Sequence, residues 1–255
     1  MSGELAEYFY ADSDVILDNI KAQEGEAMSY QTAAQAKEKY TAKMGDKLGP
    51  QFHELRQEVI YLNRKWMEYI TLFGTKPTRV QLMNATAPVF FRTVQDVFYD
   101  DMLLHIARLT DPSQMGKFSN LTFQNLSDLI NDEKLKAKVD PLLKSALEQS
   151  EFCRDWRNKL VAHRDLDVAI NGTADQINGG TREQVNKIIA TLSEILNAIE
   201  LHLTEGSTHY TFDGHTGGAK DLLFFLDDGK RRHDERRARI VSNKATPDDL
   251  AARDV

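Results

Sequence analysis

Residues 185–203, VNKIIATLSEILNAIELHL, decide the fold class of this chain. Their apolar residues recur at spacings of three and four, which places the side chains on one face of an α-helix. This stripe contains Val185, Ile188, Ile189, Leu192, Ile195, Leu196, Ile199 and Leu203. Thr181 is positioned to cap the start of the helix and Gly206 to stop it. A helix with such a continuous apolar face has to pack against other helices.

The same helical period extends through most of the remaining chain. The first strong element opens after Gly49-Pro50, carries an apolar stripe from Phe52 to Phe73 and ends at Gly74. Further helices are expected over residues 78–109, with a kink or break at Pro88, over 121–131, and over 132–162, with an irregularity at Asp140-Pro141. We find no convincing period-two strand and no internal repeat. The predicted fold class is therefore all-α, an up-and-down bundle of four to five core helices with N- and C-terminal helical extensions.

Composition shifts along the chain predict four segments around a single core. Residues 1–48 are a polar, partly helical arm, and residues 49–206 are the helical bundle itself. Residues 207–242 are a loop and a basic helix packing on the bundle, and residues 243–255 are a disordered tail. The arm is a candidate oligomer contact.

Bulk composition narrows the function classes. A formal net charge of −7 argues against a general polyanion binder, although a local basic site remains compatible with it. The single cysteine, Cys153, excludes an intramolecular disulfide framework and fits a reducing compartment. No stretch approaches the roughly 20 apolar residues that span a bilayer, and the N-terminus lacks the features of a signal peptide. We therefore expect a cytoplasmic protein that does not bind membranes.

The stretch RDWRNKLVAHRD, residues 154–165, concentrates polar chemistry between apolar residues. His163 can exchange a proton near neutral pH, and Arg157 offers a fork of donors that suits a phosphate. Asn158 can hydrogen-bond without titrating. Together these groups suffice for cleavage of RNA without a metal ion, but basic residues at a helix C-terminus are also common for structural reasons. On an ideal α-helix Arg157 and His163 lie about 120° apart, so a distorted helix or a second subunit is needed to bring them together.

This stretch resembles the R-N-x-x-x-x-H form of the HEPN (higher eukaryotes and prokaryotes nucleotide-binding) signature. The surrounding stretches WMEYITLFG (66–74), FFRTVQDVFYDDMLLHIARLTDP (90–112), NLTFQNL (120–126) and RNKLVAHRDLD (157–167) resemble the abortive-infection U-type (AbiU-like) subfamily in their order. The resemblance covers about residues 50–205.

The resemblance implies an all-α homodimer in which two R…H motifs form one composite cleft. Active members are metal-independent endoribonucleases that leave a 2′,3′-cyclic phosphate, often toxins or abortive-infection effectors. It assigns Arg157 to phosphate and transition-state stabilisation, His163 to acid–base work, and Asn158 to orienting His163 or the scissile phosphate. Some HEPN domains only bind a nucleotide or a protein partner, such as an antitoxin. That non-catalytic module is the alternative, and a purely structural helical dimer is a third interpretation.

Other residues are weaker candidates. Arg164, Arg108 and Asp101 are candidate substrate contacts, although an internal ion pair or a capped helix end would explain Asp101 and Arg108 equally well. His105 and His202 lie on largely apolar helices, where core histidines are the expectation. The loop HYTFDGH (209–215) matches no standard metal spacing, so neither a metal nor a cofactor is expected. The basic run KRRHDERRAR (230–239) fits a solvated helical face, or else a surface that docks RNA or a partner.

Overall fold

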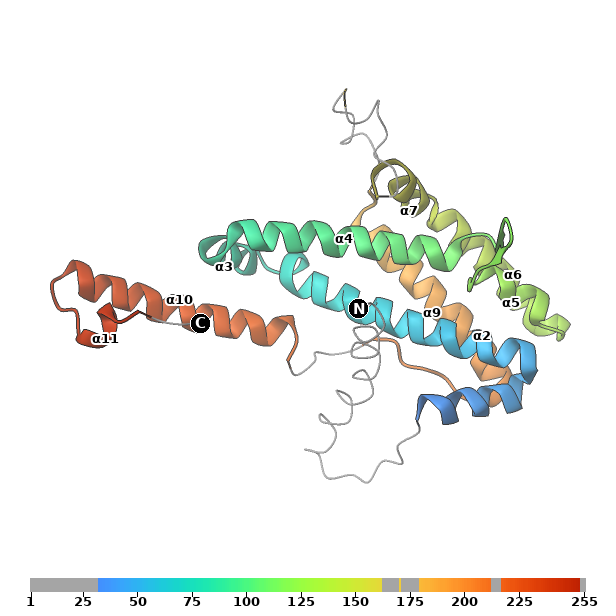
Figure 1. The fold of residues 1–255 in the computed structure, drawn as a ribbon. Helices are drawn as coiled ribbons and strands as arrows, with labels where there is room; N and C mark the ends of the chain where they lie inside the picture. The colour runs from blue at the N-terminus through green and yellow to red at the C-terminus, as the bar shows by residue number, and fades with distance from the viewer. Residues whose placement is uncertain (1–31, 162–169, 171–178, 212–216, 253–255) are drawn as a thin grey trace. The chain divides into compact units, whose positions relative to one another are not determined.

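The protein is described by a computed structural model that covers residues 32–161, 170, 179–211 and 217–252 (Figure 1). Within these residues the chain is almost entirely helical, which confirms the all-α prediction. The exception is a small antiparallel hairpin that pairs β1 (Gln114–Met115) with β2 (Phe118–Ser119). Gly116 allows its tight turn because its φ of 62° lies in the left-handed region that favours glycine.

The described residues form two compact units that interleave along the sequence. Among these residues unit 1 contains 32–59, 108–149 and 186–208, and unit 2 contains 60–107, 150–161, 170, 179–185, 209–211 and 217–252. The helices α2 (Ala33–Tyr69), α4 (Pro88–Thr110) and α9 (Arg182–Thr204) each contribute residues to both units.

Unit 1 buries the apolar stripe that opened the sequence analysis. In α9 the side chains of Ile188, Leu192 and Ile195 are fully buried, as the periodicity predicts. The unit also contains α5 (Gln124–Leu129) and α6 (Glu133–Gln149). Thr181 and Gln184 form a reciprocal capping box ahead of α9, since each backbone N–H bonds the other side chain. The left-handed residue that ends α9 is Glu205, with a φ of 61°, rather than Gly206.

The first strong helix begins earlier than predicted. It starts at Ala33, not at Gly49, and bends at Gly45, whose φ of 85° is non-helical. The bend brings the two halves of α2 together, because a Cβ on Gly49 would lie 2.5 Å from the Cα of Thr41. The described part of the expected loose arm is therefore held in unit 1. There Tyr40 is buried, and its hydroxyl donates to Glu200 Oε1 at 2.6 Å.

Unit 2 has its own apolar cluster. Leu72, Met83 and Phe91 are buried together with Ala219 and Leu223. They come from the π-helical turn η1 (Ile70–Gly74), from α3 (Pro77–Thr86), from α4, and from α10 (Ala219–Val241). The predicted break at Pro88 is confirmed, since Ala87 separates α3 from α4 in a non-helical conformation.

Two further predictions about the chain's course are wrong. The expected helix over 132–162 is not continuous: α6 runs through Pro141, and the chain breaks at Ser150, ahead of α7 (Glu151–Trp156). The tail from residue 243 is also partly ordered, because Pro247–Leu250 form the short helix α11. Both features coincide with buried polar residues, Ser150 and Asp249, which apolar periodicity does not reveal.

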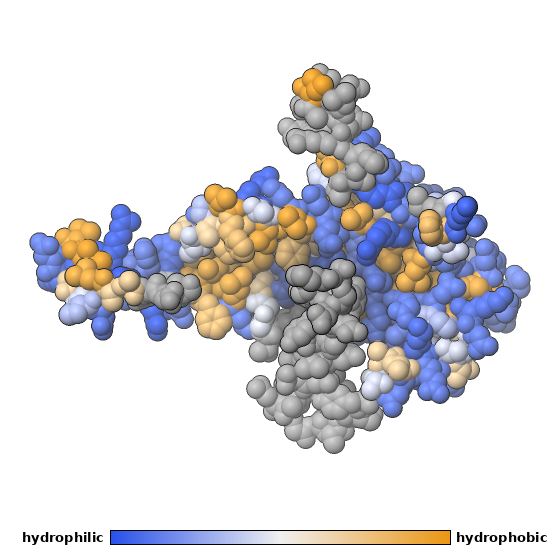
Figure 2. All heavy atoms as spheres, viewed as in Figure 1, coloured by the Kyte–Doolittle hydropathy of each residue, from blue (hydrophilic) through white to orange (hydrophobic). Residues whose placement is uncertain are grey.

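The surface of unit 2 changes character along α10. Figure 2 shows apolar side chains gathered over α3, the start of α4 and the first turns of α10, whereas the surface farther along α10 is largely hydrophilic up to a second apolar group at its far end. The exposed apolar residues include Val89, Phe90, Phe224 and Phe225. Among the described residues, no helix combines the length and apolar character needed to cross a membrane.

Candidate active site

The predicted motif begins in a π-helical turn. Arg157–Val161 form η2, which continues directly from α7. A π-helix bonds residue i to i+5, so the ideal-helix angle between Arg157 and His163 does not apply here. His163 and Arg164 lie outside the described residues. Arg157 is half-buried, and its Nε donates to Oδ1 of the exposed Asn158 at 3.1 Å.

Trp156 anchors the start of this turn. Its indole Nε1 donates to Asp100 Oδ1 of α4 at 2.7 Å. Its ring also meets Tyr99 edge-on, with centroids 6.1 Å apart. A hydrogen bond to a carboxylate is about twice as strong as one between neutral groups. The residue before Arg157 is therefore fixed by one polar and one aromatic contact, both from α4.

Gly179 and Gly180 lie against α7, just before α9 begins. A Cβ on Gly179 would lie 2.7 Å from the Trp156 ring, and a Cβ on Gly180 would lie 2.3 Å from Phe152. Gly180 also has a φ of 81°, which side chains rarely adopt. Tyr99 holds both glycines, since its hydroxyl donates to their carbonyl oxygens at 2.5 and 3.0 Å. The chain thus returns to Trp156 before α9 begins.

The inward side of α7 is chemically inert. Cys153 is completely buried, and this burial raises the pKa of its thiol to about 12. Burial likewise raises the pKa of Tyr99 to about 12. Both groups therefore stay protonated at neutral pH and contribute packing rather than acid–base chemistry.

The candidate substrate contacts lie in separate settings. Asp101, in unit 2, accepts a short hydrogen bond from the buried Lys65, whose Nζ also lies 4.8 Å from the Tyr61 ring centre. In unit 1, Nη2 of Arg108 lies 3.6 Å from Oε2 of Glu58. Each residue thus pairs with a side chain of α2 rather than with the other. The pairing gives Asp101 the structural task of compensating a buried cation.

The prediction that His105 and His202 are core histidines is confirmed for one of the two. His105 is buried as expected. His202 instead lies at the surface, with its Nε2 3.3 Å from Asp132 Oδ2. The described part of the chain contains no cluster of three or more potential metal ligands. Asp213 and His215 of the HYTFDGH loop fall outside it.

The site residues that the sequence analysis missed are the ones that position the motif. The sequence gives no sign of the bond from Trp156 to Asp100, because it joins positions 56 residues apart. Gly179 and Gly180 lie next to each other in the sequence. The adjacent glycines were a usable signal, because paired glycines often mark a close backbone approach. Lys65 carried no signal, since a lysine in an amphipathic helix is ordinarily exposed.

The comparison with known protein families identifies a family for this chain. A HEPN family model described as AbiU2 matches residues 45–222, well over half of the chain. The matched span includes α7, η2 and the glycine pair. No curated protein and no solved structure matches the chain.

Proposed function

The chain belongs to the AbiU2 family of HEPN proteins, and from this premise we propose that it is a metal-independent endoribonuclease. Its substrate is cytoplasmic RNA, and its role lies in toxin or anti-phage (abortive infection) defence. The observation that carries the proposal is the Arg157–Asn158 pair. The two side chains hydrogen-bond at 3.1 Å in a π-helical turn that Trp156 and Asp100 hold in place. Distortions of this kind frequently occur at functional sites.

The proposed reaction needs only the chain's own groups. His163 accepts the proton of a ribose 2′-OH, and the 2′-oxygen attacks the adjacent phosphorus. The bond from phosphorus to the 5′-oxygen breaks, and the protonated imidazole of His163 gives its proton to that leaving oxygen. The products are a 2′,3′-cyclic phosphate and a 5′-hydroxyl end. Arg157 stabilises the charge that develops on the phosphoryl oxygens, and Asn158 orients Arg157.

The proposed site is composite. Two copies of the chain form a homodimer, and each supplies an R…H motif to one cleft. Arg164, one residue beyond His163 in the sequence, is the proposed contact for the RNA backbone. Membership of the AbiU2 family supports this arrangement, because HEPN domains usually pair as homodimers.

The test is RNA cleavage by the purified full chain in EDTA. The Arg157→Ala variant should lose roughly 10²- to 10³-fold in rate, as for loss of a transition-state donor. The His163→Ala variant should lose roughly 10²- to 10⁴-fold, as for loss of a general base. Lys159→Ala, which removes an exposed cation of the same turn, and His209→Ala, which removes an exposed histidine, serve as matched controls. Both controls should cleave like the wild type.

Product analysis completes the test. Mass spectrometry should find fragments one water lighter than a linear phosphate, the signature of the cyclic product. Equal rates in His163→Ala and wild type would refute the assignment. A wild type that cleaves no RNA, but holds a nucleotide or a protein partner, would establish the non-catalytic module instead.

A further inference from the structure

The C-terminal helix α10 has two halves with different environments. In its first two turns Ala219 and Leu223 are buried in the apolar cluster of unit 2, and Leu226 packs against that cluster. Beyond Leu226 no apolar side chain of the helix is buried. A polar helix segment needs another source of stability, because little apolar burial supports it.

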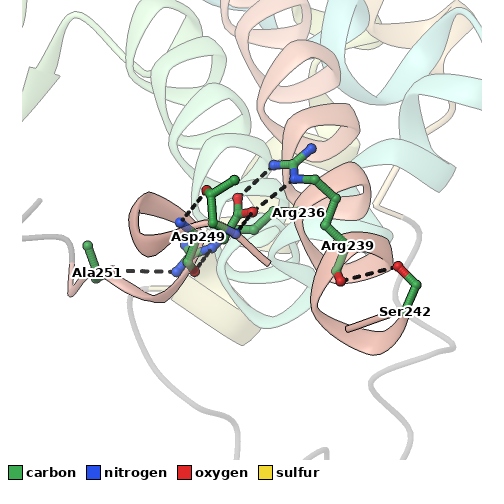
Figure 3. A network of polar contacts seen from close by, with 6 residues as sticks. Arg236, Arg239, Ser242, Asp249 and Ala251 are labelled. Carbon is green, nitrogen blue, oxygen red and sulfur yellow. Dashed lines mark hydrogen bonds and ion pairs between the residues drawn. The ribbon is translucent and has the colours of Figure 1, made fainter. Parts of the chain in front are cut away.

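That source is a clasp formed by α11. Arg239 donates from Nε and Nη2 to both carboxylate oxygens of Asp249, at 2.9 and 2.7 Å (Figure 3). Arg236 donates to the backbone carbonyls of Asp249 and Ala251 (Figure 3). Thr246 and Asp249 form a capping box at the start of α11. The Arg239 guanidinium and these hydrogen bonds hold the pKa of the Asp249 carboxyl well below its usual range.

The contacts with Asp249 and Ala251 involve residues on one face of α10. Phe225, Arg232, Arg236 and Arg239 are spaced by seven, four and three residues, so they share one face of the helix. Phe225 is 76% exposed, although it is a large apolar side chain. Arg232 is exposed and takes part in no hydrogen bond or ion pair within the described chain. This stripe therefore presents an aromatic ring, the Arg232 guanidinium, and two further guanidinium groups, those of Arg236 and Arg239, that also bond α11.

The distal part of α10 and the residues just after it are positively charged, whereas the chain as a whole is negatively charged. Residues 230–244 contain seven Lys or Arg against two acidic residues, while the chain as a whole has a net charge of −7. Within α10 the acidic residues Asp228 and Glu235 border the stripe on one flank. Lys230, Arg231 and Arg237 lie off the stripe, so the basic residues surround the distal half of α10 and the positive surface is local to this segment.

We propose that the stripe of Phe225, Arg232, Arg236 and Arg239 binds a single strand of RNA. Aromatic rings stack on unpaired bases, and guanidinium forks bind phosphates. Phe225 stacks on a base, while Arg232 and the outward N–H groups of Arg236 and Arg239 contact the backbone. The choice of RNA rests on the proposed function, for which the stripe is a second contact for the substrate.

The test is binding of a fluorescent single-stranded 2′-O-methyl oligonucleotide by the full chain, followed by anisotropy across salt concentrations. This probe lacks the 2′-hydroxyl and resists the proposed cleavage. The Arg232→Gln variant should bind several-fold more weakly, and the slope of log affinity against log salt should fall by about 0.7. Phe225→Ala should weaken binding about fivefold or more with an unchanged slope, because stacking is not ionic.

Matched controls lie in the same chain. Arg237→Gln removes an equally exposed arginine without a hydrogen bond or ion pair from α10, about 140° around the helix from Arg232. Phe118→Ala removes a 77% exposed ring from the hairpin. Both should bind like the wild type, and circular dichroism should show unchanged helix content in all four variants.

The outcomes separate the stripe from the active site. Equal weakening by Arg232→Gln and Arg237→Gln would mean general charge attraction and would overturn the stripe, as would unchanged binding in both stripe variants. A wild type that binds the probe through the stripe but cleaves no RNA would support the stripe and refute the nuclease. Cleavage and binding that persist unchanged in the stripe variants would refute the stripe alone.

Discussion

Unit 2 contains two π-helical turns of five residues, and they use the same backbone distortion in opposite ways. In η1 the side chain of Leu72 is buried in the apolar cluster, and arginines from elsewhere bind the backbone. Arg79 donates to the carbonyl of Thr71 at 2.7 Å, and Arg182 makes a short bond to the carbonyl of Gly74. In η2 the arginine is part of the turn and bonds its neighbour's side chain.

The difference shows that a π-helical turn does not by itself mark a functional site. Such a turn leaves backbone carbonyls without their usual helical partners. In η1 the arginines satisfy them, so these cations serve the fold. In η2 the polar pair Arg157 and Asn158 belongs to the turn itself. The buried apolar residues Phe152 and Cys153 come before the turn, in α7. The side chains decide which use prevails.

The largest effect is expected from a cavity in η1. Leu72→Ala should lower the free energy of unfolding by about 2–5 kcal/mol, because Leu72 is 4% exposed within a packed cluster. Urea denaturation measures this change, and activity per folded molecule should stay at the wild-type level. Leu201→Ala, at a 61% exposed leucine, should change stability by no more than about 0.5 kcal/mol. A similarly small change for Leu72→Ala would contradict the structural role of η1.

A smaller effect is expected at the anchor of η2. Trp156→Phe keeps a ring but removes the indole N–H that binds Asp100, at a cost of roughly 1–3 kcal/mol. RNA cleavage should fall further than the folded fraction does, because the turn with Arg157 shifts. Asp100→Asn retains an oxygen acceptor and should cost less. Full cleavage activity in folded Trp156→Phe would show that the position of η2 does not depend on this bond.

The smallest effect concerns the inert side of α7. The pKa of Cys153 is raised to about 12 in the folded protein from 9.0, so above about pH 9 the unfolded chain loses this proton first. Stability should therefore fall as pH rises, by at most about 1.4 kcal/mol per pH unit for this group. Tyr40 and Tyr99, each with a pKa raised to about 12, add to the fall above about pH 10.

Unfolding midpoints between pH 8 and 10.5 measure this effect, with Cys153→Ala as the control that lacks the first part of the fall. Iodoacetamide should modify the native thiol slowly at pH 8 and the unfolded thiol rapidly. Rapid modification of the folded protein would place Cys153 at the surface and contradict its burial.

The helices were predictable wherever burial follows a regular period. The stripes of α2 and α9 show this, as does the break before Pro88, because proline and apolar spacing act locally. The break at Ser150 was missed, since a buried serine there interrupts no apolar pattern. The bend at Gly45 and the clasp at Asp249 depend on contacts with distant residues, which a single sequence does not specify.

The candidate site was likewise predictable only in part. The chemistry of Arg157 and Asn158 could be read from residue types, but the π-helical turn that pairs them could not. Asp101 and Arg108 were grouped by helical spacing, whereas Lys65 and Glu58 of α2 determine their actual pairings. Spacing along one helix gives directions around its axis and leaves partners on other helices unknown.

The glycine pair has a consequence for the spacing of the helices around it. A methyl group at Gly179 would lie 2.7 Å from the Trp156 ring, and one at Gly180 would lie 2.3 Å from the Phe152 ring. Both rings belong to α7, the helix that continues into η2. The gap between α7 and the start of α9 is therefore only as wide as bare backbone, and any side chain at either glycine has to displace an aromatic ring of α7.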